Sequence, residues 1–139
     1  MICMACVASS EGLRQYAYRD VGGVWTICYG ETKNIQKGDT ATIAQCKEML
    51  GARIERDFGP QVDKCVKGPI PPARKAALTS FAYNVGAGAM CRSSVVRKLN
   101  AGDVRGGCDA LLLYDKAGGK KVPGLLSRRK KERELCLAS

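Results

Sequence analysis

The chain has 139 residues, enough for one domain with a hydrophobic core, and its 45% apolar content is ordinary for a globular protein. No apolar run reaches the roughly 18 residues that cross a membrane, so we expect no membrane span in this chain. The formal net charge of +10 indicates an anionic partner. Charge alone does not choose between nucleic acid and other polyanions, and a basic surface without a dedicated partner remains open.

Eight cysteines and no histidine limit the chemistry that the cysteines can do. A Cys/His zinc site is excluded, and a four-cysteine site needs two close pairs, whereas only Cys3 and Cys6 are close. We therefore expect no metal and no other cofactor. Disulfides formed in an oxidising compartment are the better interpretation, although the sequence does not give their connectivity.

The first forty residues predict a short helix followed by a β-hairpin. Residues 1–11 favour a helix that ends near Gly12, because glycine readily adopts the left-handed conformation that terminates helices. An alternating aromatic run, a glycine-containing turn at residues 20–23 and a β-rich run at residues 24–29 predict the hairpin. Glu11 then lies at a helix end and Asp20 at a hairpin turn.

A long helix is predicted over residues 42–59, connecting the hairpin region to the rest of the chain. Thr42 and Gln45 have the spacing of a capping box, and the apolar residues that follow recur at helical spacing. We expect Gly59 and Pro60 to end or kink this helix, since proline lacks an N–H and clashes with the preceding turn.

The second half of the chain is predicted to be helical. Residues 67–72 contain prolines that exclude a helix interior. Asp103, and either Ser93 or Ser94, are expected to cap helices. The expected helices cover about residues 72–84, 93–99, 104–115 and 123–137, and we find no internal repeat or linker to a second domain.

Three residues of the N-terminal region suit the hydrolysis of a glycosidic bond. Two carboxyl groups on opposite walls of a cleft supply this chemistry, one as the acid and one as a carboxylate. Glu11 is the candidate acid, because the partial negative charge of a helix C-terminus disfavours its ionised form. Asp20, on a more solvated turn, is expected to stay ionised, and the Thr26 hydroxyl to hold the attacking water. The competing interpretations are an ordinary surface acid, a turn aspartate and a strand threonine.

These residues form the pattern E-x8-D-x5-T, which closely resembles the phage lysozyme (endolysin) family, glycoside hydrolase family 24, and within it the lambdoid phage members. The resemblance continues in order through SFAYNVGAG (80–88), RKLNAGD (97–103) and PGLLSRRKKERELCL (123–137). It implies an α+β, lysozyme-like fold in a single catalytic domain of residues 1–139. A small lobe with a β-hairpin (11–41) and a larger helical lobe (60–139) are then joined by the long helix (42–59), with a cleft between the lobes.

The resemblance also implies the reaction and further site residues. It implies cleavage of the β-1,4 bond between N-acetylmuramic acid and N-acetylglucosamine in bacterial peptidoglycan, with inversion, by a monomer. Asn84 is the substrate-binding candidate, or else a helix C-cap. Tyr29 and Tyr83 are candidates to pack against sugar rings, or else core residues. Arg128 or Arg129 is implied as the charge partner of the catalytic acid, or else part of a solvated basic face.

By the same resemblance, we expect disulfides between Cys65 and Cys91, Cys108 and Cys136, and Cys28 and Cys46. One position departs from better-known members: Glu31 stands where some have a histidine in a structural ion pair. We expect that pair to be missing here and the change to concern stability rather than catalysis.

The resemblance places the enzyme in the host periplasm. Met1 to Ala8 is apolar but too short for a complete secretory signal, so we expect that an apolar export or signal-anchor segment has been trimmed from this chain. Two alternatives remain: a peptidoglycan-binding module without catalysis, and a basic nucleic-acid-binding domain. The latter usually needs a basic recognition helix or an aromatic stacking platform, and with aromatic content of only 6% we expect no nucleic acid partner.

Overall fold

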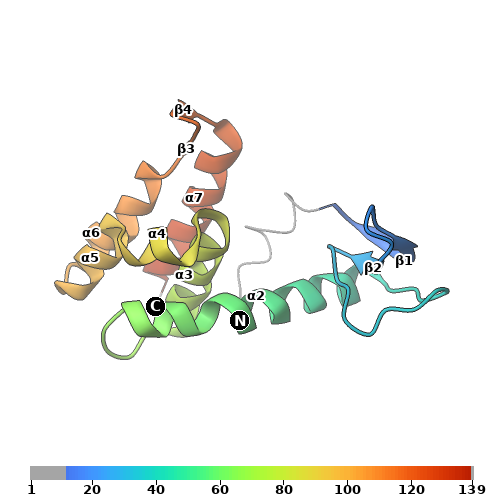
Figure 1. Cartoon of the computed structure of the whole chain (residues 1–139). Coiled ribbons are helices and arrows are strands. Elements are labelled where there is room, and N and C mark those ends of the chain that lie inside the picture. The colour runs from blue at the N-terminus through green and yellow to red at the C-terminus, as the bar shows by residue number, and fades with distance from the viewer. Residues whose placement is uncertain (1–11, 139) are drawn as a thin grey trace.

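The structure is a computed structural model that describes residues 12–138, and it confirms the α+β class. A β-hairpin of β1 (Arg14–Arg19) and β2 (Trp25–Cys28) lies at one end of the long helix α2 (Ile43–Cys65). The remaining helices gather around the other end of α2 (Figure 1). Two apolar clusters correspond to this arrangement, one beneath the hairpin and a larger one among the helices, and Phe58 and Leu135 pack against both.

The predicted hairpin is present and a third segment extends it. β1 and β2 are antiparallel, with Tyr18 opposite Thr26 and an irregular register toward Arg14. The chain then returns alongside β1, where the Ala41 N–H donates to the Gln15 carbonyl at 3.0 Å. This backbone bond fixes the start of β1 relative to the start of α2.

The capping box predicted at the start of α2 is confirmed. The Thr42 hydroxyl accepts from the Gln45 N–H at 3.1 Å, and the Gln45 side chain accepts from the Thr42 N–H at 2.8 Å. The predicted helix boundary at residues 59–60 is wrong, because α2 continues through Pro60 to Cys65. Proline inside a helix costs about 3 kcal/mol, but the extra turns bury Val62, which is worth about 1.5–3 kcal/mol, and reach the main core.

The larger lobe is built around helix α3 (Pro72–Val85), whose alanine-rich middle is buried. The last helix, α7 (Pro123–Leu137), packs along α3. Three short helices cover the core on other sides: α4 (Ala87–Cys91), α5 (Ser94–Asn100) and α6 (Val104–Ala110). The N-caps of α5 and α6 are Ser93 and Asp103, of which Asp103 was predicted outright and Ser93 as one of two candidates.

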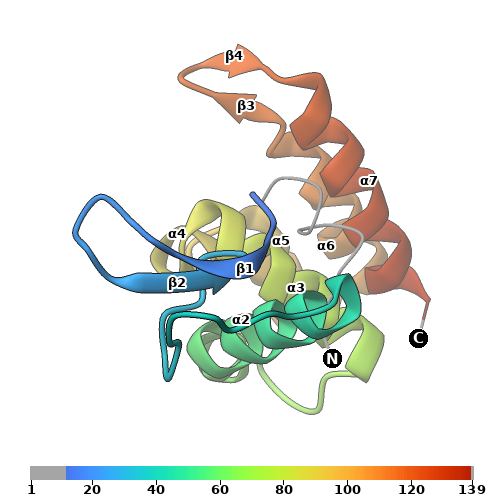
Figure 2. The same cartoon turned by 90° about the vertical axis from the view of Figure 1, so that its right-hand side faces the viewer.

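The helix expected over residues 104–115 ends earlier than predicted. After α6 the chain tightens into a 3-10 turn, η2 (Leu111–Leu113), in which Leu111 is fully buried. It then forms a small antiparallel hairpin of β3 (Lys116–Ala117) and β4 (Lys120–Lys121), which projects from the start of α7 (Figure 2). Leu111 itself keeps helical backbone angles, with φ −53° and ψ −36°, and the helical path ends at Tyr114, with φ −99° and ψ 55°.

Three disulfides connect elements that are distant in sequence. They join β2 to α2, α2 to α4, and α6 to α7, with Cα separations of 4.9, 5.4 and 5.6 Å. The cysteines paired are those that the resemblance implies: Cys28 with Cys46, Cys65 with Cys91, and Cys108 with Cys136. Cys3 and Cys6 lie outside the described residues. Within residues 12–138, no helix is long and apolar enough to cross a membrane.

Candidate active site

Asp20 lies in the turn between β1 and β2, and its side chain organises that turn. Its Oδ1 accepts from the backbone N–H groups of Gly22 and Val24, both at 2.9 Å. Its own N–H donates to the Val24 carbonyl at 3.0 Å. Gly23 takes a positive φ of 79°, which a residue with a side chain adopts only with strain. The carboxylate is therefore held in one orientation by the backbone of its own turn.

Thr26 follows on β2 and is tied to the same residue as Asp20. Its hydroxyl donates to the Val24 carbonyl at 2.9 Å, so Val24 holds both candidates through its two backbone groups. The side chain is only 4% exposed. With its hydrogen already committed, the hydroxyl can only accept a hydrogen bond from a water molecule.

The third candidate, Glu11, lies outside the described residues. The separation between its carboxyl group and that of Asp20, which the inverting mechanism requires to be roughly 6.5–9.5 Å, therefore remains a prediction. Among residues 12–138 there is also no group of three or more acidic or cysteine side chains arranged to hold a metal ion.

The substrate-binding candidates fall into different environments. Asn84 is exposed near the end of α3, and the helix C-cap is Gly86 with a φ of 93°, so Asn84 is not the cap residue. Tyr83 is half-buried, with its ring edge-on to Phe58 at a centroid distance of 5.7 Å. Tyr29 is 7% exposed within the smaller core, which leaves little of its ring for a ligand.

Arg128 and Arg129 are not on a solvated basic face, because both are buried against α3. The Arg128 Nη2 donates to the Ser80 carbonyl at 3.0 Å, and its guanidinium carbon lies 5.9 Å from the centre of the Tyr83 ring. The corresponding carbon of Arg129 lies 4.9 Å from the centre of the Phe81 ring. The expectation of a solvated face fails because these two positions of α7 point into the core rather than away from it.

Ser80 and Glu132 complete this buried group and were missed from the sequence. Glu132 is 0% exposed, and its Oε2 accepts from the Ser80 hydroxyl at 2.6 Å and from Arg129 Nη2 at 3.1 Å. Its Oε1 lies 2.8 Å from Arg129 Nε, close enough for an ion pair but without hydrogen-bond alignment. The available signal was spacing, since Glu132 follows Arg128 by four residues and Arg129 by three on one helix.

Burial dominates the electrostatics of this group. It raises the pKa of Glu132, against the opposing effects of Arg129, Ser80 and Arg128. It lowers the pKa of Arg129 to about 10, and the nearby Glu132 opposes that shift.

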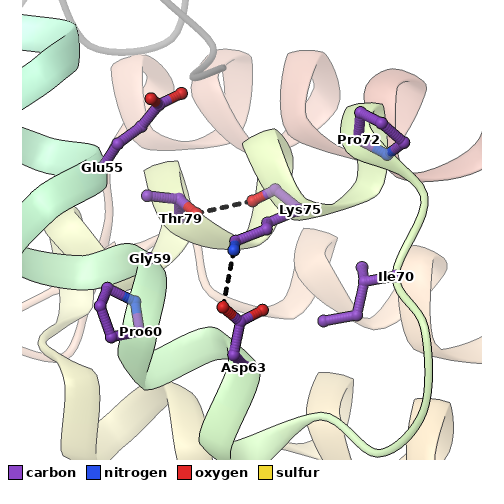
Figure 3. Close-up of a pocket in the computed structure, with 8 residues that line it drawn as sticks. All are labelled: Glu55, Gly59, Pro60, Asp63, Ile70, Pro72, Lys75 and Thr79. Carbon is purple, nitrogen blue, oxygen red and sulfur yellow. Dashed lines mark hydrogen bonds and ion pairs between the residues drawn. The ribbon is translucent and has the colours of Figure 1, made fainter.

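A pocket of about 380 Å³ is lined by residues of α2, of α3 and of the segment between them (Figure 3). It contains an ion pair in which Lys75 Nζ lies 2.7 Å from Asp63 Oδ2. Neither Asp20 nor Thr26 lines it, so its position does not support a role in the site described above.

Comparisons with known proteins match this chain to phage lysozymes and endolysins. The family model "Phage lysozyme" matches residues 8–132. A protein named SAR-endolysin from Enterobacteria phage PA-2 is 44% identical over 128 residues, which are 91% of this chain and 77% of that protein. The solved endolysin of Escherichia coli O157:H7 phage FAHEc1 is 33% identical with a TM-score of 0.68, covering 96% of this chain and 89% of that one. A mutant of P22 lysozyme is 30% identical with a TM-score of 0.75, covering 99% and 98%.

Proposed function

The chain belongs to the phage lysozyme family, and on this premise we propose that it is an endolysin that hydrolyses bacterial peptidoglycan and so lyses the host cell. The bond cleaved is the β-1,4 linkage between N-acetylmuramic acid and N-acetylglucosamine. The observation that carries the proposal is the arrangement of Asp20 and Thr26, which one backbone residue, Val24, holds together at the hairpin turn.

Each of the three candidate residues has a distinct role in this proposal. Glu11 protonates the leaving oxygen, which requires an acid that is still protonated well above about 4.3, the pKa of free glutamate. Asp20 stabilises the positive charge that develops on the sugar and orients the attacking water. Thr26 accepts a hydrogen bond from that water. The water attacks from the face opposite the leaving group, and Asp20 accepts its proton as the general base, so the sugar is inverted.

The remaining candidates are assigned either to substrate binding or to pairing with the catalytic acid. Asn84, exposed near the end of α3, offers an amide donor and acceptor to an N-acetyl group. Tyr83 packs against a sugar ring, whereas we assign Tyr29 to the core because of its burial. We assign Arg128, rather than Arg129, as the charge partner of Glu11, since 8% of its side chain remains exposed and none of Arg129 does.

We further propose that the protein acts as a monomer in the periplasm, with residues 1–139 as one catalytic domain. The lobes are residues 11–41 and 60–139, with α2 as their connection. Three disulfides suit an oxidising compartment, and proteins named SAR-endolysin are the relatives of high identity.

The first prediction tests the proposed function. Purified protein added to outer-membrane-permeabilised Gram-negative cells should reduce their turbidity. Glu11→Gln should lower the rate of this turbidity loss by at least about 100-fold, because the amide cannot donate the proton. Glu48→Gln, on the exposed side of α2, is the matched control and should lyse like the wild type. Lysis that survives Glu11→Gln would remove Glu11 from its role. Binding to cell walls without lysis by the wild type would indicate a module without catalysis.

A further inference from the structure

Glu132 is fully buried, and among the described residues its hydrogen-bond and ion-pair partners lie on α3 and on α7 itself. Its Oε2 accepts from the Ser80 hydroxyl at 2.6 Å, from Arg129 Nη2 at 3.1 Å and from Arg128 Nε at 3.4 Å. One carboxylate oxygen thus receives three donors. Two arginines and one glutamate, all buried, leave the group with an excess of positive charge.

Stability alone does not explain this group. Burial raises the pKa of Glu132 and lowers the pKa of Arg129, so the fold disfavours the charged form of both. Buried ion pairs contribute no more to stability than apolar side chains of the same volume, and often less. Arg129 Nη1 also has no hydrogen-bond partner among the described residues. Charged groups kept at such a cost are typical of functional sites.

The two arginines have different surroundings, and only one of them borders the candidate site. Arg129 is fully buried over the Phe81 ring, in the main core. Arg128 retains 8% of its side-chain surface and lies over Tyr83, the residue that we propose to pack against substrate. Two of the bonds of Arg128, from Nη2 to the Ser80 carbonyl and from Nε to Glu132, fix the plane of its guanidinium.

We propose that Glu132, held by Ser80, is a positioning residue that fixes Arg128 beside Tyr83 and offsets its charge. This inference rests on the proposed function, in which Arg128 neighbours the catalytic acid. A nearby guanidinium stabilises an ionised carboxylate and so works against an acid that must stay protonated. Glu132 holds Arg128 in its orientation and at the same time weakens the electrostatic effect of Arg128 on the catalytic acid. Glu132 is not a catalytic residue, since it acts only through Arg128.

Other charged groups packed against α7 are engaged elsewhere. On α6, Asp109 Oδ1 accepts from Arg133 Nε at 2.6 Å. On α3, Arg74 Nε donates to the Cys136 carbonyl at 3.0 Å. Glu55 of α2 lines the pocket with Asp63 and Lys75. The groups that act on Glu132 besides burial are Arg129, Ser80 and Arg128.

The second prediction follows from removing the charge of Glu132. In Glu132→Gln the guanidinium of Arg128 is no longer offset, so the pKa of the catalytic acid falls. The alkaline limb of the kcat/KM profile on purified peptidoglycan should then move to lower pH by about one unit. The matched control is Asp109→Asn, which removes the acid of the half-exposed Asp109–Arg133 pair between α6 and α7 and should leave the limb in place. A Glu132→Gln enzyme with the wild-type limb would overturn the proposal.

A double variant covers the case in which Glu132→Gln does not fold. Arg128→Gln combined with Glu132→Gln removes one charge of each sign, so the net charge of the group is unchanged. If Glu132 acts through Arg128, the double variant should have the pH profile of Arg128→Gln alone. A further shift in the double variant would contradict the proposal. Failure of the proposed function is distinguishable, because it would show as a wild-type protein without lytic activity or as lysis that survives Glu11→Gln.

Discussion

Asp20 illustrates how a single side chain satisfies both a structural and a functional interpretation. Its Oδ1 caps the hairpin turn by accepting two backbone N–H groups. That is the ordinary role of a turn aspartate. The proposed reaction additionally requires the negative charge of the carboxylate. The two roles are separable, because an amide oxygen can accept the same N–H groups without carrying charge.

The third prediction uses this difference. Asp20→Asn should keep the turn and the thermal unfolding midpoint close to the wild type, yet lower kcat by about 100-fold or more, because the charge that stabilises the transition state is lost. The matched control is Asp39→Asn, since Asp39 Oδ2 accepts from the Gln36 N–H at 2.8 Å in another turn of the same lobe. Turnover and circular dichroism melting of the three proteins decide the point. An active Asp20→Asn enzyme would leave Asp20 with its structural role alone.

For single residues, the sequence could indicate which ones are candidates for the site, but not which contacts they make. Asp20 and Thr26 stand out through spacing and resemblance, and both lie at the hairpin turn. The Ser80–Glu132 bond could not be predicted, since it joins residues 52 apart in sequence through the packing of α3 on α7. A serine in an alanine-rich helix carries no signal until its partner helix is placed.

Among the elements, the β1–β2 hairpin depends on α2 for its position. The Cys28–Cys46 disulfide joins the end of β2 to the first turns of α2. Arg53 adds a second connection, donating from Nη2 to the Tyr29 carbonyl at 3.0 Å and from Nη1 to the Gly30 carbonyl at 3.1 Å. Glu31 Oε2 lies 3.8 Å from Arg53 Nη1. Glu31 therefore lies within ion-pair distance of a cation that α2 presents, a contact that the sequence did not predict.

The fourth prediction concerns this connection. Arg53→Gln loses two charge-assisted bonds to backbone carbonyls, so the free energy of unfolding should fall by about 2 kcal/mol and the β2 amides should exchange faster. Arg56→Gln is the matched control, since Arg56 pairs with the adjacent, exposed Asp57 and its loss should lower the free energy of unfolding far less than the loss of Arg53. Hydrogen exchange and urea denaturation distinguish them. Equal losses in both variants would mean that Arg53 does not anchor the hairpin.

Element boundaries were predictable where a local signal decides them and not where packing does. The capping box at Thr42 and the cap at Asp103 are local, and the structure contains both. The continuation of α2 through Pro60 goes with the burial of Val62 in the main core, whereas no local signal marks the early end of α6. Local rules of propensity cannot anticipate a core that forms only after the helices meet.

The net positive charge of the whole molecule is the remaining large feature. The formal net charge is +10. On the projecting β3–β4 hairpin, Lys116 lies directly opposite Lys121, with Lys120 beside them, and all three are exposed. Like charges across a strand pair destabilise a hairpin, so this placement is unfavourable unless an anionic surface lies nearby. Peptidoglycan, as the proposed substrate, carries carboxylates on its peptides.

The fifth prediction is that activity on intact cell walls depends on ionic strength through this hairpin. Because salt shortens the Debye length to about 10 Å at 0.1 M, kcat/KM on cell walls should fall about tenfold between roughly 0.01 and 0.2 M salt. Neutralising the three hairpin lysines to glutamine should flatten that dependence. The same number of exposed lysines changed away from this hairpin is the matched control for net charge: Lys33 and Lys37 of the other lobe, and Lys47 on α2. If both triple variants flatten the dependence equally, net charge rather than the hairpin attracts the enzyme. If only the hairpin variant does, the electrostatic attraction acts through the position of these lysines.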